Sequence, residues 1–128
     1  MIDVSLLVGR RLEAVVKHDH VWGFTFSGGL GLEVSCLWRL LVTGKLNVTS
    51  EDHGHQFGLA TPVDGRAVLR QLLVGTPVTA ATARAGTVDL SLEFGVRGTL
   101  EVIATSAGYE AWVLGGADFF MVGQPGYE

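Results

Sequence analysis

The four histidines of the chain fall in two His-x-His pairs, His18-Asp19-His20 and His53-Gly54-His55. On an extended segment, residues i and i+2 share a face with side chains about 6 to 7 Å apart, which suits two ligands of one metal ion. Glu51 and Asp52 add carboxylates beside the second pair. Imidazole together with carboxylate accepts zinc or another divalent ion. The residues His18, His20, His53 and His55 therefore form a candidate metal site.

The same pairs have a structural interpretation as solvated residues beside turns, where His and Asp are common. Their separation differs from the ligand spacing of known zinc modules, which favours the structural interpretation. His18 continues the apolar alternation of Leu12, Ala14 and Val16. This phase predicts that its ring enters the rim of the core as a hydrogen-bonded group.

Other arrangements for catalysis receive less support. Glu33 and Glu101 occupy matching positions on predicted strands, and two carboxylates brought together can divide the roles of acid and base. Solvated strand residues are the favoured interpretation of both. Cys36 lies on an apolar face by its phase, and the chain contains no Gly-x-Ser-x-Gly sequence, so a nucleophilic triad is not indicated.

Two similar halves must position these side chains. Leu6-Leu7-Val8-Gly9 recurs as Leu72-Leu73-Val74-Gly75, and Gly31-Leu32-Glu33-Val34 recurs as Thr99-Leu100-Glu101-Val102. The offset grows by two residues between these anchors, and we place the insertion in the turn around 95–98. The sequence therefore predicts a single domain, 1–128, with pseudo-repeats at about 3–55 and 61–123 and pseudo-two-fold symmetry.

Each half is predicted to be a helix followed by a meander of strands. Runs such as Trp22-Gly23-Phe24-Thr25-Phe26 alternate apolar with small or polar residues, which is typical of antiparallel strands with one buried face. Thr61-Pro62-Val63-Asp64 predicts a helix start with Thr61 as the N-cap, and Gly75 predicts its end. Residues 3–8 are the shorter counterpart. The predicted fold class is α+β, mostly antiparallel β, internally duplicated.

The second half departs from the first by six extra residues, Ser106–Ala111, before its tryptophan. Such departures are places where a scaffold acquires function. Tyr109, Glu110 and Trp112 form an amphipathic group of the kind enriched at interfaces, although a core tryptophan beside a turn tyrosine explains them equally well. The predicted binding residues are His18, His20, Glu51, His53, Tyr109, Glu110 and Trp112.

Composition restricts the classes of partner. The 128 residues are 48% hydrophobic and 17% charged, with a net charge of -4, so excess apolar surface predicts a homodimer. The 9 Lys and Arg residues form no cluster, which argues against nucleic acid. The N-terminus does not have the pattern of a secretory signal, no apolar run approaches ~18 residues, and Cys36 is the single cysteine. These features predict a cytoplasmic protein with no membrane partner.

Four segments resemble a family of small bacterial proteins of uncharacterised function. They are His18-Asp19-His20-Val21-Trp22-Gly23-Phe24, Cys36-Leu37-Trp38-Arg39-Leu40, Ser50-Glu51-Asp52-His53-Gly54 and Ser106-Ala107-Gly108-Tyr109-Glu110-Ala111-Trp112. The resemblance spans most of the chain. It implies a cytosolic bacterial protein.

Two functions from different classes follow. The leading hypothesis is a non-enzymatic protein-binding or regulatory module of a bacterium, for which an immunity-type role would fit, with no cofactor. The alternative is a small metal-dependent or ligand-binding enzyme that uses the same histidines and acids, with zinc or another divalent metal as cofactor.

Overall fold

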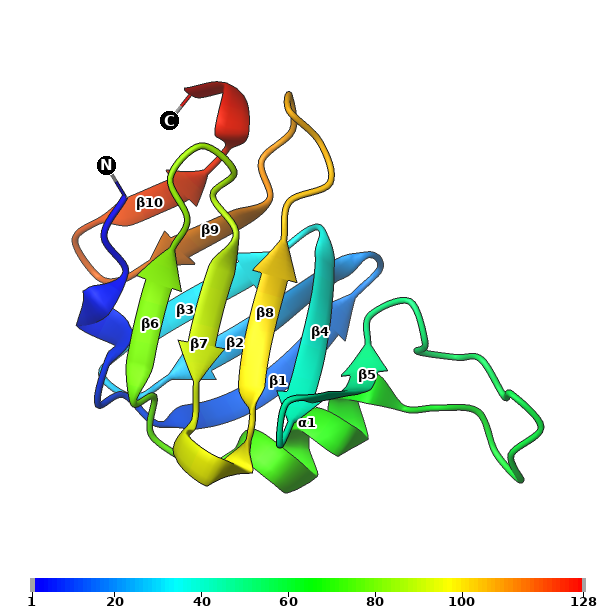
Figure 1. The fold of residues 1–128 in the computed structure, drawn as a ribbon. Helices are drawn as coiled ribbons and strands as arrows, with labels where there is room; N and C mark the ends of the chain where they lie inside the picture. Colours follow the sequence, from blue (N-terminus) through cyan, green and yellow to red (C-terminus); the bar gives the residue numbers. More distant parts are fainter. Residues whose placement is uncertain (1, 128) are drawn as a thin grey trace.

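The computed structural model describes residues 2–127 as two antiparallel sheets of five strands packed face to face (Figure 1). The strand orders are β1-β2-β3-β9-β10 and β5-β4-β8-β7-β6. The strands are β1 (Leu12–His18), β2 (Val21–Phe26), β3 (Leu30–Val34), β4 (Leu37–Val42), β5 (Lys45–Thr49), β6 (Ala80–Ala83), β7 (Leu90–Glu93), β8 (Thr99–Ile103), β9 (Trp112–Gly115) and β10 (Phe120–Gly123). The helices of these residues are α1 (Gly65–Leu73) and the 3₁₀ turns η1 (Ser5–Leu7), η2 (Gly95–Arg97) and η3 (Pro125–Tyr127). The predicted class, α+β with mostly antiparallel β, is confirmed.

The core lies between the two sheets. Trp22, Phe24 and Phe26 of β2 are buried while Thr25 between them is exposed, as strand alternation requires. Helix α1 packs against β1 and β5, and η1 packs against β6. These helices close the lower end and one side of the sandwich in Figure 1, which leaves the opposite end to loops.

The strands of the two halves have the same topology. In each half the first three strands form a meander, and the last two form a hairpin that crosses to the other sheet, where β9 pairs with β3 and β4 pairs with β8. Gly9 N donates to Val78 O and Gly75 N donates to Leu12 O, at 2.8 and 2.7 Å. Strands β1 to β5 therefore follow the same connectivity as strands β6 to β10. Origin by duplication stays a prediction.

The extra two residues of the second half lie in a different turn from the predicted one. Trp22 pairs with Val34, and Leu90 pairs with Val102, so the β2–β3 and β7–β8 turns have equal lengths. The longer connection is the β6–β7 loop, 84–89, which matches a short β1–β2 turn. Placing the insertion at 95–98 was wrong because a short apolar run fits two alignments, whereas backbone pairing fits one.

A β-bulge in β1 changes which side chains face the core. The pairing of β1 with β2 shifts between Leu12 and Ala14, and the extra residue reverses the alternation beyond it. Val16 is therefore 42% exposed, and His18 is exposed as well. The prediction that His18 enters the core rim is wrong for this reason.

Helix α1 begins at Gly65, and its N-cap is Asp64 and not the predicted Thr61. The Asp64 carboxylate accepts a hydrogen bond from Ala67 N at 3.2 Å. Val63 is held extended because its N–H and C=O bond to His55 and Gly54, so the residues before Asp64 cannot enter the helix. Gly75, at φ +89°, ends the helix as predicted.

Candidate functional site

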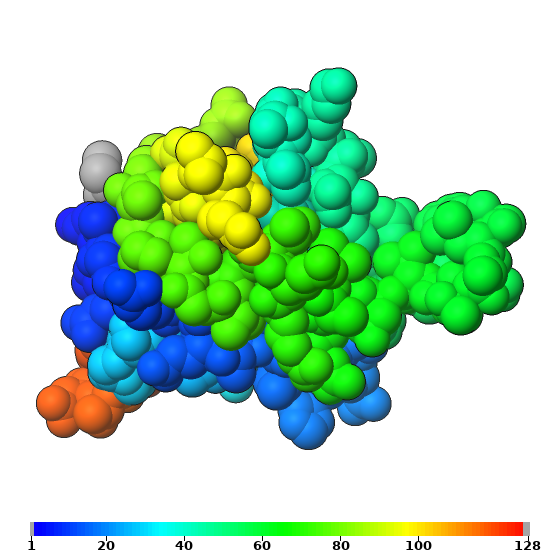
Figure 2. All heavy atoms as spheres, turned by 90° about the horizontal axis from the view of Figure 1, so that it is seen from below, coloured from blue at the N-terminus to red at the C-terminus, as the bar shows by residue number. Residues whose placement is uncertain are grey.

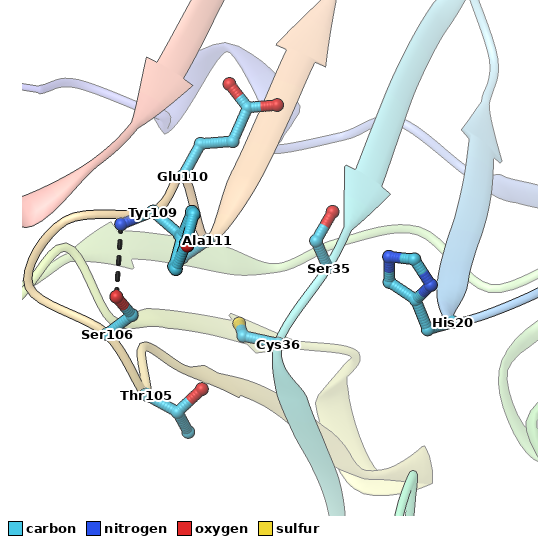
Figure 3. A pocket seen from close by; sticks show the side chains of 8 residues that line it. All are labelled: His20, Ser35, Cys36, Thr105, Ser106, Tyr109, Glu110 and Ala111. Carbon is cyan, nitrogen blue, oxygen red and sulfur yellow. Dashed lines mark hydrogen bonds between the residues drawn. The ribbon is translucent and has the colours of Figure 1, made fainter.

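Two adjoining hollows occupy the end of the sandwich where the chain crosses between sheets. They have volumes of about 310 and 580 Å³ and share His20, Ser35, Cys36 and Thr105. Ser35 and Cys36 form the β3–β4 crossing, and Thr105 lies in the β8–β9 crossing. Figure 3 shows His20 and the two crossing segments facing the smaller hollow.

The smaller hollow owes its wall to the six-residue insertion. Trp112 pairs with Val34, and Trp38 pairs with Val102. The two tryptophans therefore occupy equivalent positions in their halves, although six more residues precede Trp112. Among the inserted residues, Ser106 Oγ accepts hydrogen bonds from Gly108 N and Tyr109 N, each at 3.1 Å. Figure 3 shows the bond from Tyr109 N. The predicted position of the insertion agrees with the strand register.

Neighbouring segments hold the insertion in place. Gln124 Nε2 donates to Gly108 O at 2.6 Å, Ala111 N donates to Gly123 O at 2.7 Å, and Ser35 N donates to Ala111 O at 2.9 Å. Tyr109 remains 81% exposed and Glu110 is also exposed. An ordered backbone therefore presents an aromatic ring and a carboxylate to solvent.

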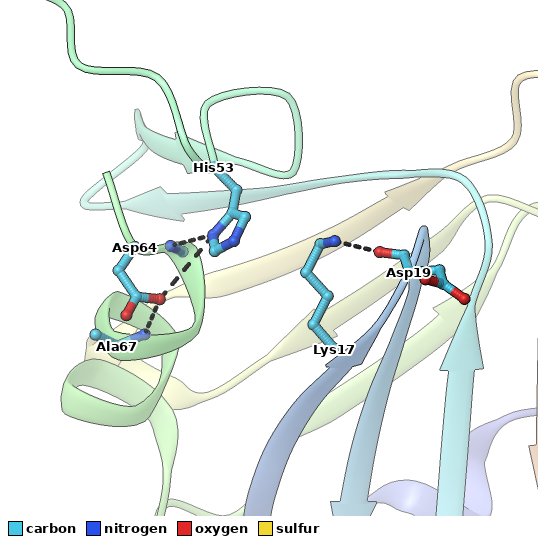
Figure 4. A network of polar contacts seen from close by, with 6 residues as sticks. Lys17, Asp19, His53, Asp64 and Ala67 are labelled. Carbon is cyan, nitrogen blue, oxygen red and sulfur yellow. Dashed lines mark hydrogen bonds and ion pairs between the residues drawn. The ribbon is translucent and has the colours of Figure 1, made fainter. Parts of the chain in front are cut away.

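The larger hollow lies above Trp22, which is 2% exposed. Lys17 extends along it and donates from Nζ to Asp19 O (Figure 4). Its ammonium lies 5.7 Å from the centroid of the Trp22 ring. Ser50, Glu51 and His53 supply the opposite wall. Charged groups of both signs thus border an aromatic floor.

This hollow exists because the β1–β2 turn is short. At the matching place in the other half, the β6–β7 loop fills the space: Trp112 Nε1 donates to Val88 O, and Ala104 N donates to Asp89 Oδ1, both at 2.8 Å. Trp38, the counterpart of Trp112, is fully buried, and its Nε1–H has no hydrogen-bond partner within residues 2–127. Both hollows therefore lie where the halves differ.

His53 connects the larger hollow to helix α1. Its Nδ1 accepts from Gly65 N at 3.1 Å and lies 4.0 Å from Asp64 Oδ1 (Figure 4). Its ring meets Trp22 edge-on with centroids 5.2 Å apart. The Nδ1 lone pair is therefore used within the fold, and His53 fixes the start of the helix against the aromatic floor.

The four histidines are not brought together as the candidate metal site requires. Asp19 and Gly54, the middle residues of the two pairs, have φ of +53° and +85°, so neither pair is extended and its rings do not share a strand face. His18 and His20 border an outer hollow, and His20 and His53 border the larger hollow. His55 stacks on Phe57 at 5.5 Å. Within residues 2–127 no group of three or more His, Cys, Asp or Glu side chains is placed to hold a metal ion.

The predicted binding residue Trp112 needs correction, and the disfavoured acid–base interpretation of Glu33 and Glu101 is excluded. Trp112 is fully buried and cannot belong to a binding surface; it is a core residue whose Nε1–H is bonded internally. Glu33 and Glu101 lie on different sheets, and Glu101 pairs with Arg39 at 2.5 Å. They cannot act as an acid–base pair because matching positions in the two halves fall on opposite outer faces of the sandwich.

The remaining predicted residues border the hollows: His20 both of them, Tyr109 and Glu110 the smaller, Glu51 and His53 the larger. Sequence reasoning missed Lys17, Trp22, Ser35, Cys36 and Thr105. Lys17 was missed because the β1 bulge reverses the side on which it lies. Ser35 and Cys36 directly follow the first anchor, and Thr105 comes shortly after the second, so the anchors were a signal for them.

Cys36 is held as a thiol at neutral pH. Burial, and secondarily the negative charge of Asp89, raise its pKa from 9.0 to about 11. Because the thiolate is the reactive form, we expect iodoacetamide to alkylate Cys36 about 100-fold more slowly at pH 8 than a thiol of pKa 9.0. The rate should rise about tenfold per pH unit up to pH ~11.

Mass spectrometry of the intact protein across pH 7 to 11 measures this rate. The urea-unfolded chain is the control, since its thiol is solvated. Equal alkylation of folded and unfolded protein at pH 8 would contradict the shift.

An arm projects from the sandwich beside the larger hollow. Residues 51–64, between β5 and α1, stand out from the body in Figure 1, and Figure 2 shows the same projection from below. The arm is ordered by the bonds of Val63 to Gly54 and His55. It carries Phe57 and Leu59, which are 67% and 55% exposed. A long ordered loop with an apolar tip is typical of interaction segments.

Comparison of the chain with protein-family models, curated proteins and solved structures gave no match. Among the described residues, no helix has the length and apolar character needed to cross a membrane.

Proposed function

We propose that the chain is a non-enzymatic module that binds a protein partner at the two hollows. The observation that carries the proposal is that both hollows lie where the halves differ, and that Tyr109, Glu110 and His20 border them. The first half packs without any counterpart of the Ser106–Ala111 insertion, so packing of the scaffold does not require an insertion with an exposed aromatic ring. Selection for contact with a partner explains it.

The chemistry of the side chains supports binding rather than catalysis. Cys36 is protonated at neutral pH and so is a poor nucleophile. His53 uses Nδ1 to accept from Gly65 N, and the two strand glutamates lie on different sheets. The candidate reactive groups are thus either occupied or separated.

The surface also indicates the character of the partner. Tyr109 offers a ring for packing, while Glu110 and Glu51 place carboxylates at the two hollows. In a chain of net charge -4, these groups favour a partner that presents apolar and basic side chains together. Phe57 and Leu59 of the arm provide a second contact beside the same site.

A regulatory role, of which an immunity-type role is one form, would fit such a module. The resemblance to a family of small bacterial proteins supports the bacterial cytoplasm as its location. One observation favours the alternative, a small metal-dependent or ligand-binding enzyme: the volumes of about 310 and 580 Å³ are in the range of small-molecule sites. Stoichiometric zinc in untagged purified protein would favour that alternative.

Photo-crosslinking tests the proposal. We expect p-benzoylphenylalanine in place of Tyr109 to give a discrete protein adduct in the native cells. The same group at Val96 should give none, since Val96 is 93% exposed in η2 at the opposite end of the sandwich. With the crosslinked protein identified, Glu110→Lys should weaken its binding about tenfold or more. Equal adducts at both positions, or none at position 109, would refute the proposal.

A further inference from the structure

Four strands form the edges of the two sheets, and three of them are protected. The edges are β1 and β10 in one sheet and β5 and β6 in the other. β1 carries a bulge and the charged residues Glu13 and Lys17, and β5 carries Lys45 and an irregular pairing with β4. Helix α1 packs on both, and η1 packs on β6. Bulges, charges and covering helices are the usual means of preventing edge-to-edge pairing.

β10 has neither charge nor bulge. Its four residues pair with β9 without a register shift, and the sequence from Phe119 to Tyr127 contains no charged residue. Phe120 is 75% exposed and Phe119 is 42% exposed. Natural proteins rarely leave such a strand open to solvent.

The backbone of β10 can accept another strand. Gly116 N donates to Phe119 O at 2.9 Å, so residues 119, 121 and 123 direct their N–H and C=O groups toward β9. Antiparallel alternation then directs those of Phe120 and Val122 away from the sheet. The open edge therefore carries two residues with both backbone groups available for pairing.

We propose that β10 of a second copy of the chain occupies this edge, antiparallel and related by a two-fold axis at Met121. In that register Phe120 of each copy exchanges both backbone hydrogen bonds with Val122 of the other, so the segment is its own complement. Each β10 strand then pairs with an identical strand. Because this stretch carries no charge, the pairing avoids the repulsion between like charges that other surfaces of a chain of net charge -4 would meet in a symmetric dimer. The β1-β2-β3-β9-β10 sheet of one copy and the same sheet of the other then form one continuous sheet.

This inference is independent of the proposed binding function. β10 also continues into Gln124, whose side chain holds Gly108 of the insertion. A dimer through β10 would therefore place two copies of the site on one rigid sheet, and a partner with two epitopes would bind by avidity.

Sedimentation equilibrium of the full chain tests the proposal. We expect a species of twice 13.6 kDa and a dissociation constant raised about 100-fold or more by Phe120→Lys. Leu46→Lys, on the protected edge β5 and 60% exposed in the native protein, is the matched control and should leave the dimer intact. Circular dichroism verifies folding of both variants.

Amide hydrogen exchange tests the same contact without substitution. Exchange at Phe120 and Val122 should slow as the wild-type protein is concentrated, since their N–H groups then enter the ladder. A single 13.6 kDa species at all concentrations, a dimer that survives Phe120→Lys, or exchange independent of concentration would each overturn the proposal.

Discussion

Trp112→Ala is expected to lower the free energy of unfolding by about 3–5 kcal/mol, the range for removing a buried tryptophan. Trp112 is fully buried between the sheets, and its indole N–H is the hydrogen-bond partner of the Val88 carbonyl. Val88 is itself buried and has φ +60°, which is unusual for a β-branched residue. The substitution leaves a cavity and an unpaired carbonyl together. Urea unfolding followed by circular dichroism measures the change.

The two matching tryptophans separate these contributions. Trp112→Phe leaves Val88 O without its donor, whereas Trp38→Phe removes an N–H that has no partner in the described structure. We expect Trp112→Phe to cost about 1–3 kcal/mol more than Trp38→Phe, because an unsatisfied buried carbonyl carries its desolvation penalty. Equal costs would show that the hydrogen bond to Val88 contributes nothing measurable.

Gly123→Ala is expected to destabilise the fold by about 1–3 kcal/mol or more, through overpacking. A Cβ at Gly123 would lie within 2.1 to 2.6 Å of three atoms of the Trp112 indole, and the buried ring has no room to move. Gly31→Ala is the control, since a Cβ at that strand position meets nothing within 4 Å. It should leave the stability almost unchanged.

A double substitution identifies the cause of this destabilisation. The three crowded atoms, Cδ2, Cε2 and Nε1, belong to the indole ring, which alanine at position 112 removes. Gly123→Ala combined with Trp112→Ala should therefore be less destabilising than the sum of the two single changes. Additive costs would refute a direct clash between the two residues.

The sequence predicted those features of the fold that are written in local patterns. Alternation gave antiparallel strands, Gly75 gave the end of α1, and the distances from Val34 to Trp38 and from Val102 to Trp112 located the insertion. Alternation does not specify which sheet a strand joins. The crossing of β4–β5 and β9–β10 to opposite sheets was therefore invisible, and so was the separation of Glu33 from Glu101 that results.

The candidate site was predictable only in part, for a related reason. Tyr109 and Glu110 were found because an insertion disrupts a repeat, which is visible in the residues. The β1 bulge adds one residue without changing the composition of its strand. The sequence therefore gave no sign that His18 would point to solvent or that Lys17 would lie over the larger hollow. The metal hypothesis required each His-x-His pair to be extended, so that its two rings share one face of a strand. The left-handed backbone at Asp19 and Gly54 likewise removes this arrangement.

The exchange of hairpins between the halves has a consequence for synthesis on the ribosome. β3 acquires its second neighbour only from β9, and β4 only from β8, so the first half emerges with two interior strands still open at one edge. Roughly 60 residues separate the end of β5 from the start of β9, a delay of about 3 to 12 seconds at ordinary rates of translation. During that interval the nascent chain exposes unpaired strands, which makes it a substrate for chaperones that shield such edges until the second half arrives.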